Sequence, residues 1–353
     1  MTSMMRCYHL HSFRQSLAPF DKPMPEPTGS QVLLKVLAAG VCHSDLHMQD
    51  GEIDLGNGQV VSFAARCKMP MTLGHETCGE VVAVGPDATG VAIGDKHLVC
   101  GWIGCGTCSF CRQGDEHLCL DSRFLGVSRD GGFADHIVVP HPRYLIELGG
   151  LDPVAAAPLA CSGLTTYSAL KKAGQTLQHY PIVVIGAGGL GLMSLNILRM
   201  MGGKGAVVLE IDAQKRRAAL ECGALAAIDP SSPEADRQIR AAVGGPVLFV
   251  LDLVGSADSA AQGFRLLDRG GKLLVVGLLG GAMALPVPML VIRSATLQGS
   301  YIGSPSELRE LMALVRAKGM PKVPLDRRSL RDANQAMDDL RAGRVVGRVV
   351  LVP

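Results

Sequence analysis

The segment Pro181–Gly202, PIVVIGAGGLGLMSLNILRMMG, decides most of what the sequence predicts about the fold. A short β-branched run precedes GAGGLG, and an apolar stretch follows, which is the pattern of a strand, a tight turn and a helix. Gly186, Gly188 and Gly191 provide the G-x-G-x-x-G spacing. Glycine at these positions permits a sharp turn, close approach to a pyrophosphate and tight packing of helix against strand. The segment therefore predicts a dinucleotide site at a helix N-terminus, where the helix dipole favours phosphate.

An acidic residue follows at a suitable distance. Glu210 ends the next apolar strand, nineteen residues after Gly191. A carboxylate there accepts hydrogen bonds from the adenosine ribose and repels a 2′-phosphate, so we expect NAD rather than NADP. Arg216 and Arg217 lie nearby in the sequence and weaken this preference.

Helical and extended patterns alternate beyond this unit. We expect helices over 213–221, 233–243 and 257–267, and strands over 247–253 and 272–276. Strands that alternate with helices indicate a doubly wound parallel sheet.

The rest of the chain differs in character. Residues 1–162 are rich in Val, Gly and Pro with short extended runs, which predicts an irregular β-rich domain. Residues 163–300 form the nucleotide-binding domain, and residues 301–353 return to the first domain with a helix at 306–318 and a final strand in GRVVLVP. The predicted fold class is therefore α/β with two domains.

Composition excludes several kinds of protein. The 353 residues are 48% hydrophobic and 19% charged, which excludes intrinsic disorder and suits two domains. A net charge of +2 and an aromatic content of 4% argue against nucleic acid or a membrane surface as a partner. The first residues lack an apolar signal segment, so we expect a cytoplasmic protein.

One uncharged run, 273–292, is long enough to span a bilayer. It is interrupted by Gly277, Gly280, Gly281, Pro286 and Pro288. This punctuation predicts a buried strand, a turn and a second extended segment instead.

Four of the eleven cysteines lie within CGTCSFCRQGDEHLC. The spacing C-x2-C-x2-C-x7-C suits a tetrahedral zinc ion bound by four thiolates. Because this lobe has little apolar material, we expect metal binding to supply its folding energy. With four thiolates available, we expect His117 at the surface rather than as a ligand. The expected structural zinc ligands are Cys105, Cys108, Cys111 and Cys119.

A second group of metal-binding residue types is dispersed. Cys42 lies in GVCHSDLH, His75 and Glu76 in TLGHETCGE, and Cys161 in PLACSGLTTYSAL. Two Cys and one His suit an open catalytic zinc site, but spacing alone does not bring them together. A lone cysteine is more often a small core residue. We assign that role to the remaining Cys7, Cys67, Cys78, Cys100 and Cys222.

Taken together, these motifs resemble those of the zinc-dependent medium-chain alcohol dehydrogenases. GVCHSDLH, LGHE, the four-cysteine lobe, ACSGLT, GAGGLG and the closing GRVV occur in order over essentially the whole chain. WIGCGTC, VPHPRYL, APLACSGLTTYSALKK and LDLVGS are similar to the 6-hydroxyhexanoate dehydrogenase-like subgroup. The resemblance implies a GroES-like front domain, a Rossmann NAD-binding domain and two zinc ions per chain.

The resemblance also implies a catalytic metal site. Cys42, His75 and Cys161 would bind the catalytic zinc ion. Glu76 would lie behind it as an adjacent or alternative ligand, and Asp45 would orient His75.

Substrate and cofactor residues follow from the same resemblance. Ser44 would hydrogen-bond the substrate hydroxyl, His47 would pass its proton to solvent, and Trp102 would line the substrate pocket. Among the cofactor contacts, a histidine and an arginine would face the phosphates, a lysine the ribose, and a threonine and a leucine the nicotinamide. The full set is His43, Arg348, Lys215, Thr165, Leu190, Gly186, Gly188, Gly189, Gly191, Glu210, Val254, Gly277 and Leu278.

The implied reaction is the reversible NAD-linked oxidation of a primary or secondary alcohol, by hydride transfer from a zinc-bound alkoxide. Zinc lowers the pKa of bound water from about 15.7 to about 7, and a bound alcohol is acidified comparably. Segment 52–69 would form a wall of the substrate cleft. Arg66 or Lys68 there would meet the distal carboxylate of an ω-hydroxy acid such as 6-hydroxyhexanoate.

Two alternatives remain from the sequence. One is a zinc-dependent polyol dehydrogenase or enoyl reductase of the same superfamily. The other is a non-catalytic NAD-sensing or zinc-binding protein, which would be expected to have lost a ligand or a proton-relay residue. We also expect a homotetramer, with a homodimer as the alternative, formed through the extended run 284–299.

Overall fold

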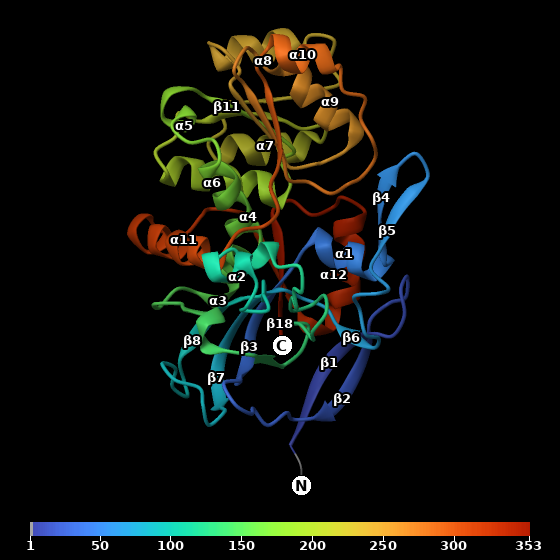
Figure 1. Ribbon diagram of the computed structural model, residues 1–353, viewed down its shortest axis with the longest axis vertical. Helices are drawn as coiled ribbons and strands as arrows, with labels where there is room; N and C mark the ends of the chain where they lie inside the picture. Colours follow the sequence, from blue (N-terminus) through green and yellow to red (C-terminus); the bar gives the residue numbers. More distant parts are fainter. Residues whose placement is uncertain (1–2) are drawn as a thin grey trace.

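The structure is a computed structural model that describes residues 3–353. Helices and a parallel sheet occupy the upper part of Figure 1, and antiparallel sheets occupy the lower part. Helices α4 (Ser162–Lys171) and α11 (Pro305–Lys318) lie between the two parts. The predicted combination of a β-rich unit with a nucleotide-binding unit is therefore confirmed.

A six-stranded parallel sheet forms the nucleotide-binding unit, in the order β13-β12-β11-β14-β15-β16. All four residues of each of the strands β11, β12 and β14 are buried, because helices cover both faces of the sheet. Its strands are β11 (Ile182–Ile185), β12 (Ala206–Leu209), β13 (Ala226–Ile228), β14 (Phe249–Asp252), β15 (Lys272–Val275) and β16 (Thr296–Gly299). Its helices are α5 (Thr176–His179), α6 (Gly189–Met200), α7 (Ala213–Glu221), α8 (Ala235–Val243), α9 (Ala257–Leu266) and α10 (Val287–Ile292).

The β-rich part contains a seven-stranded sheet with the path β10-β8-β7-β3-β18-β17, in which β9 also pairs with β3. A three-stranded sheet, β2-β1-β6, lies beside it. The strands are β1 (Met4–Leu10), β2 (Ala18–Pro23), β3 (Val32–Val41), β6 (Met71–Thr72), β7 (Glu76–Val84), β8 (Lys96–Cys100), β9 (His136–Val139), β10 (Leu145–Glu147), β17 (Leu325–Ser329) and β18 (Arg348–Val352). Strand β18 pairs antiparallel with β3, so the last residues return to the first sheet.

Short helices connect these strands. The α-helices are α1 (His43–Asp50), α2 (Ser109–Gln113), α3 (Pro153–Ala156) and α12 (Ala333–Arg341). The 3-10 turns are η1 (Glu116–Leu118), η2 (Pro142–Tyr144), η3 (Ala157–Ala160) and η4 (Leu330–Asp332).

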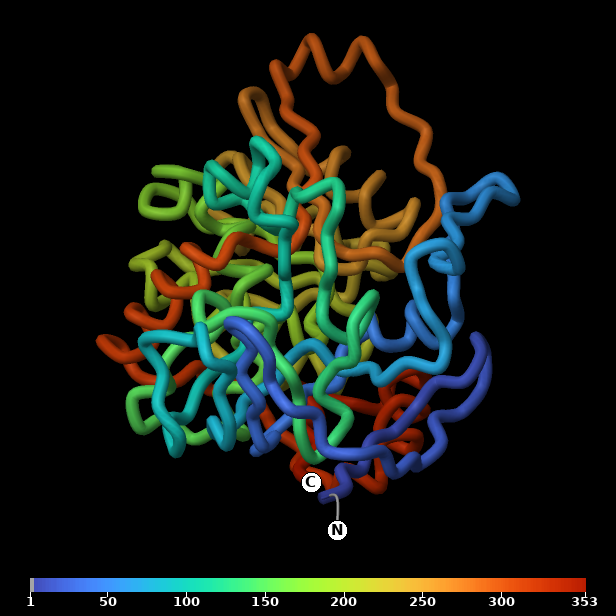
Figure 2. Tube along the Cα trace, turned by 60° about the horizontal axis from the view of Figure 1, so that its bottom comes forward, coloured from blue at the N-terminus to red at the C-terminus, as the bar shows by residue number. Residues whose placement is uncertain are grey.

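A two-stranded hairpin, β4 (Glu52–Gly56) and β5 (Gln59–Ser62), projects from the side of the molecule. Figure 2 shows this light-blue hairpin beside an orange segment of the nucleotide-binding unit. The N–H of Gly281 donates a hydrogen bond to the carbonyl of Asp54 at 3.3 Å. The hairpin therefore contacts the nucleotide-binding unit as well as the β-rich part.

The uncharged run 273–292 differs from its prediction in one respect. Its first part is strand β15 as expected, but its last part is helix α10 rather than an extended segment. Pro288 falls in the first turn of this helix, where its missing N–H leaves no hydrogen bond unmade. The run 284–299, which we expected to be an extended subunit interface, also contains helix α10 and is therefore not extended throughout. Within residues 3–353, no helix has both the length and the apolar character needed to cross a membrane.

Candidate active site and metal centres

Four residues from distant parts of the chain converge in one buried cluster. Cys42 precedes α1, His75 and Glu76 lie at the start of β7, and Cys161 precedes α4. One ligand atom from each residue lies within 4.8 Å of all the others, and all four residues are buried. The fold therefore brings together the dispersed residues that sequence spacing could not connect.

Asp45 organises this cluster from behind. Its Oδ1 lies 3.2 Å from Nδ1 of His75 and accepts the N–H of Gly74 at 3.1 Å. Its Oδ2 accepts the N–H of Cys42 at 2.9 Å. Two ligand-bearing segments are therefore oriented by one buried carboxylate.

The cluster has the chemistry that a zinc ion requires. Nε2 of His75 is buried and has no hydrogen-bond partner within residues 3–353, although Nδ1 faces Asp45. Contact with Cys161 and His75 lowers the pKa of Cys42 well below its usual value, which favours the thiolate. An unpaired imidazole nitrogen between two sulfur atoms fits the Cys2His set of a catalytic zinc site.

Glu76 and Arg348 join the cluster to the glycine-rich loop. The Arg348 guanidinium, from β18, donates to Oε2 of Glu76, and both side chains are buried. Burial raises the pKa of Glu76 to about 7, although the charge of Arg348 opposes this rise. A Cβ on Gly189 would lie 2.5 Å from Cδ of Arg348, so this arginine also borders the loop. Arg348 thus lies between the cluster and the expected phosphate position.

The polar residues of α1 lie beside the cluster. The Ser44 hydroxyl is 3.9 Å from Sγ of Cys42. His47 lies three residues further on, which places it on the same face of the helix. Partial enclosure by the protein lowers the pKa values of His43 and His47, so both imidazoles are neutral near pH 7.

Trp102 lies against His75 rather than open in the cleft. Its ring centroid is 5.3 Å from that of His75, and its Nε1 donates to the carbonyl of Ala160 at 3.1 Å. The side chain is buried at 3% exposure. A role in lining the substrate pocket stays a prediction.

The glycine-rich loop has the geometry that its three glycines suggested. Gly186 has a φ of +97°, which a residue with a Cβ rarely adopts. A Cβ on Gly188 would meet no atom within 4 Å, so the loop is open there. A Cβ on Gly191 would lie 2.1 Å from the carbonyl oxygen of Gly186, so helix and turn approach closely.

Glu210 lies at the end of β12, next to this loop. Its carboxylate accepts the N–H of Ala187 and the N–H of Asp212, both at 2.9 Å. Arg216 donates instead to the carbonyls of Glu210 and Ile211 and to Asp229, so it is turned away from the loop.

Lys215 borders a groove of about 530 Å³ between the start of α7 and the segment after α12. This groove is adjacent to the loop and is large enough for part of a nucleotide. Its other lining residues are Asp212, Ala213, Gln214, Ala342, Gly343, Arg344 and Val346.

Two further loops contribute the other expected cofactor residues. Gly277 packs directly on the backbone of Val254, where a Cβ would lie 2.1 Å from its carbonyl carbon. Buried Asp252 holds these loops by accepting the N–H groups of Val254 and Gly255, both at 3.0 Å. The sequence analysis did not identify Asp252, although its position at the end of a buried strand was a usable signal.

The remaining expected cofactor residues lie near the cluster or in the loop. Thr165 is in the first turn of α4 and donates its N–H to the carbonyl of Cys161 at 2.8 Å. Leu190 is partly exposed at the start of α6, and Leu278 is exposed after β15.

The four-cysteine lobe forms a second candidate metal site. The ligand atoms of Cys105, Cys108, Cys111 and Cys119 all lie within 4.8 Å of one another. The Sγ–Sγ distances are 3.9 Å for Cys105–Cys111 and 3.8 Å for Cys108–Cys119. Sulfur atoms at the corners of a tetrahedron around zinc are about 3.8 Å apart, given Zn–S bonds of about 2.3 Å. Backbone N–H groups of residues 105, 107, 108 and 111 point at these sulfurs, as expected for bound thiolates.

His117 corrects one expectation about this lobe. It is not part of the four-sulfur group, but it is buried at 8% exposure rather than lying at the surface. Burial also lowers its pKa, and Glu307 and Lys172 are among the charged groups that act on it. Tertiary packing therefore buries His117, which the local sequence of the lobe did not indicate.

Fold and site together define a two-domain, nucleotide-dependent metalloenzyme. Residues 28–149 match the profile of the alcohol dehydrogenase GroES-like domain, and residues 189–317 match that of the zinc-binding dehydrogenases. An NAD-dependent alcohol dehydrogenase of Sulfurisphaera tokodaii is 37% identical over 350 residues, covering 99% of this chain and 100% of the relative.

Solved structures agree with these sequence matches. The alcohol dehydrogenase of Aeropyrum pernix has a TM-score of 0.88 at 30% identity, covering 99% of this chain and 100% of the other. An acetophenone reductase of Geotrichum candidum in complex with NAD has a TM-score of 0.82 at 27% identity, covering 100% and 98%. The chain belongs to the zinc-dependent medium-chain alcohol dehydrogenase family and is therefore an oxidoreductase. The family predicted from the motifs is confirmed.

Proposed function

We propose that this enzyme oxidises a primary or secondary alcohol to the aldehyde or ketone with NAD⁺, reversibly and with zinc. The observation that carries this proposal is the buried cluster of Cys42, His75 and Cys161, with its unpaired His75 nitrogen. The cluster is linked through Glu76 and Arg348 to the glycine-rich loop. Metal and dinucleotide chemistry would therefore meet at one place.

The chain's own residues support the steps of this reaction. A zinc ion at the cluster supplies Lewis-acid activation of the substrate hydroxyl. We assign to Ser44 the hydrogen bond that takes up the hydroxyl proton, and to neutral His47 its transfer to solvent. Thr165 would lie against the nicotinamide, which would accept the hydride from the alcohol carbon. Proton and hydride together account for the two-electron oxidation.

The coenzyme site favours NAD in our proposal. Glu210 presents its carboxylate at the loop, where it would bind the ribose hydroxyls and repel a 2′-phosphate. Arg216 is held by the carbonyls of Glu210 and Ile211, so it is not free to bind that phosphate.

A narrower proposal concerns the substrate. The segment after β5 exposes Arg66 and Lys68, and we propose that segment 52–69 forms a wall of the substrate cleft. A cation there favours an alcohol with a distal carboxylate, an ω-hydroxy acid such as 6-hydroxyhexanoate.

Assembly is proposed on the basis of exposed apolar surface. Helix α10 exposes Val287, Val291 and Ile292, and the edge strand β16 exposes Leu297. An unpaired sheet edge with apolar neighbours favours pairing with another copy. We propose a homotetramer, with a homodimer as the alternative, and sedimentation distinguishes them.

We also propose the boundaries of the two domains and the cellular compartment of the protein. We assign residues 1–162 and 301–353 to the catalytic domain and residues 163–300 to the coenzyme domain. The eleven cysteines are all unpaired, which favours a reducing compartment such as the cytoplasm.

The function is tested with zinc analysis and an absorbance assay for NADH over alcohols, polyols and hydroxy acids. We expect two zinc ions per chain and NADH formation. His47→Gln should lower kcat about 100-fold, because the proton loses its acceptor. Zinc at one ion per chain with no NADH from any substrate would instead support an NAD-sensing protein. Turnover of activated C=C bonds with NADH, but of no alcohol, would support an enoyl reductase.

A further inference from the structure

The hairpin β4–β5 lies against the nucleotide-binding unit, as Figure 2 shows. None of residues 52–62 is fully buried, so the hairpin has little apolar packing of its own. A two-stranded hairpin without such packing is at best marginally stable in water. Contacts with other segments must therefore hold it in place.

Two glycines let the hairpin approach the other unit closely. A Cβ on Gly56 of the hairpin would lie 2.8 Å from the carbonyl carbon of Gly281. From the other side, a Cβ on Gly280 would lie 2.6 Å from the carbonyl oxygen of Asp54. The same oxygen accepts the N–H of Gly281 at 3.3 Å. The two backbones are therefore in direct contact, with no room for a side chain between them.

The segment that receives the hairpin is also bonded to a loop of the expected coenzyme site. The N–H of Gly280 donates to the carbonyl of Gly255 at 3.0 Å. The N–H of Leu279 donates to the carbonyl of Val254 at 3.1 Å. The Val254 side chain reaches the glycine-rich loop, since a Cβ on Gly186 would lie 2.9 Å from its Cγ2. A continuous series of contacts therefore runs from the hairpin to the loop that we assign to the pyrophosphate.

The base of the hairpin belongs to the catalytic domain. The hairpin begins at Glu52, one residue after the C-cap of α1, and α1 carries Ser44 and His47. Arg14 of the β-rich part pairs with Glu52 at 2.5 Å. The hairpin thus has its base beside the proposed proton path and its contact surface on the coenzyme domain.

We propose that the hairpin β4–β5 is a positioning element for the coenzyme, which holds segment 279–282, and through it the loop at Val254, in the arrangement that binds the dinucleotide. This inference rests on the proposed function, because it takes Val254 and the glycine-rich loop as coenzyme contacts. It adds residues 54–56 of the catalytic domain, which act through another segment, to the groups that determine coenzyme affinity.

The expected effect follows from how a positioned segment changes binding. Only molecules whose segment has the binding arrangement take up the coenzyme, so the apparent Kd rises as that population falls. Loss of the contact should therefore weaken coenzyme binding and leave turnover of the bound complex nearly unchanged. Because coupling is reciprocal, bound coenzyme should also hold the hairpin more firmly on its segment.

Gly56→Ala tests the contact, and Gly58→Ala is its matched control. The two glycines lie close together in the hairpin with φ values of +81° and +75°, so alanine is strained similarly at each. A Cβ on Gly58 would meet no atom within 4 Å, so only Gly56→Ala separates the two backbones. In the zinc-loaded enzyme, Gly56→Ala should raise the Kd of NADH and the KM of NAD⁺ about tenfold relative to Gly58→Ala, with kcat within about twofold.

Gly280→Ala disturbs the same contact from the opposite side. Its control is Gly270→Ala in the same unit, because Gly270 also has a positive φ and a Cβ there would meet no atom within 4 Å. Gly280→Ala should weaken NADH binding as Gly56→Ala does. The double variant should bind NADH about as well as either single variant, since both remove one contact. Additive effects of the two substitutions would contradict a shared contact.

Amide hydrogen exchange gives a readout that requires no substitution. NADH should slow exchange in peptides that cover residues 52–62 of the unaltered enzyme, and should do so less in Gly56→Ala. Equal Kd values for Gly56→Ala and Gly58→Ala, or hairpin exchange that NADH leaves unchanged, would overturn the positioning role while the proposed function stands. If the unaltered enzyme binds NADH but oxidises no alcohol in the panel, the proposed function is wrong, and the Kd values still decide the role of the hairpin.

Discussion

Single carboxylates control much of this site. Asp45 orients His75 and the Cys42 segment, and Glu76 holds Arg348 between the cluster and the loop. Glu210 joins the end of β12 to the loop, because it accepts the N–H of Ala187 as well as that of Asp212. Removal of any of these groups leaves buried or directed donors without a partner, which is costlier than the mean hydrogen bond suggests.

Glu210 should determine the choice of coenzyme. Glu210→Gln keeps the size of the side chain but removes the charge, so the KM for NAD⁺ should rise about tenfold while NADP⁺ becomes a better substrate than before. Steady-state kinetics with both coenzymes measure this change. Glu221→Gln, which alters an exposed residue at the end of α7, the helix that follows Glu210, is the control. Equal KM values for NAD⁺ in the two variants would contradict the assignment.

At the scale of elements, the C-terminal segment is held in place by ion pairs. Asp339 on α12 accepts from Arg328 on β17 and from Arg344, both at 2.6 Å. The hydrogen bonds from Arg344 and Arg328 lower the pKa of Asp339 to about 2. These contacts connect the last helix to the sheet that carries β18, and β18 carries Arg348.

The lowered pKa of Asp339 predicts how the stability of the protein changes with pH. An unpaired Asp in the unfolded chain has a pKa of about 3.9, so the stabilisation is complete above that value and is lost as the pH falls through about 2. Asp339→Asn should therefore lower the urea midpoint at pH 7, and the difference from the unaltered protein should shrink at pH 3. Asp338→Asn, at an exposed neighbouring position, is the control. A difference that stays constant from pH 7 to pH 3 would show that the charge of Asp339 is not responsible.

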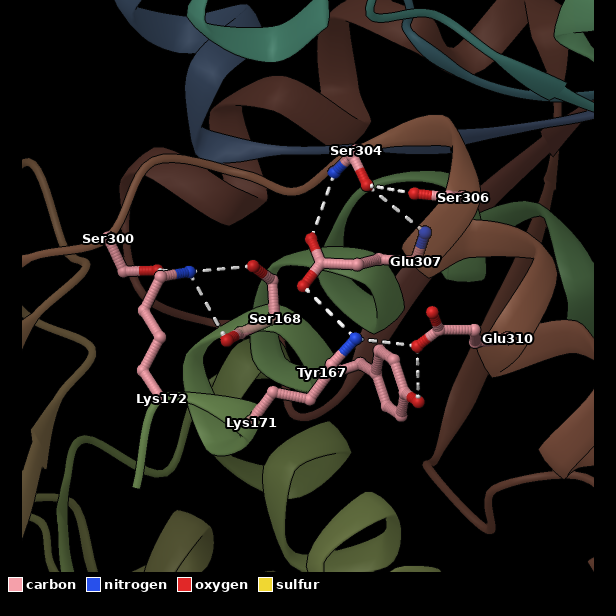
Figure 3. A network of polar contacts seen from close by, with 9 residues as sticks. All are labelled: Tyr167, Ser168, Lys171, Lys172, Ser300, Ser304, Ser306, Glu307 and Glu310. Atoms are coloured by element: carbon pink, nitrogen blue, oxygen red, sulfur yellow. Dashed lines mark hydrogen bonds and ion pairs between the residues drawn. The ribbon is translucent and has the colours of Figure 1, made fainter. Parts of the chain in front are cut away.

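For the molecule as a whole, the four-cysteine lobe is connected to the rest of the protein at His117. The charges of Glu307 and Lys172 reach His117, which is buried where the lobe packs. The same two residues belong to the polar network that connects α4 with α11 (Figure 3).

Loss of the two metal sites should have different consequences. Cys108→Ser and Cys42→Ser should each purify with about one zinc ion fewer per chain. Cys108→Ser should lower Tm more, because folding of the lobe depends on its metal, whereas the catalytic cluster lies in a formed core. Metal analysis and thermal unfolding measure both effects. An equal or smaller fall in Tm for Cys108→Ser would refute the structural role.

The sequence alone was sufficient where the signal is local. The glycine loop, Glu210, the alternation of strands and helices and the four-cysteine spacing each depend on residues that are close together in the chain. The motif resemblance extended this to the family, which the comparisons confirm. Local signals failed for α10, where a proline in a first helical turn was interpreted as a break, and for His117, whose burial comes from a distant contact.

Only the tertiary structure decided which distant side chains meet. Residue spacing carries no information on whether Cys42, His75 and Cys161 converge, because their approach is set by the pairing of β3 with β7 and by packing of η3 against β7. The same holds for the Glu76–Arg348 pair and for the polar network that joins α4 to α11. The sequence by itself thus determined the units and the cofactor loop, and long-range packing determined the geometry of the site between them.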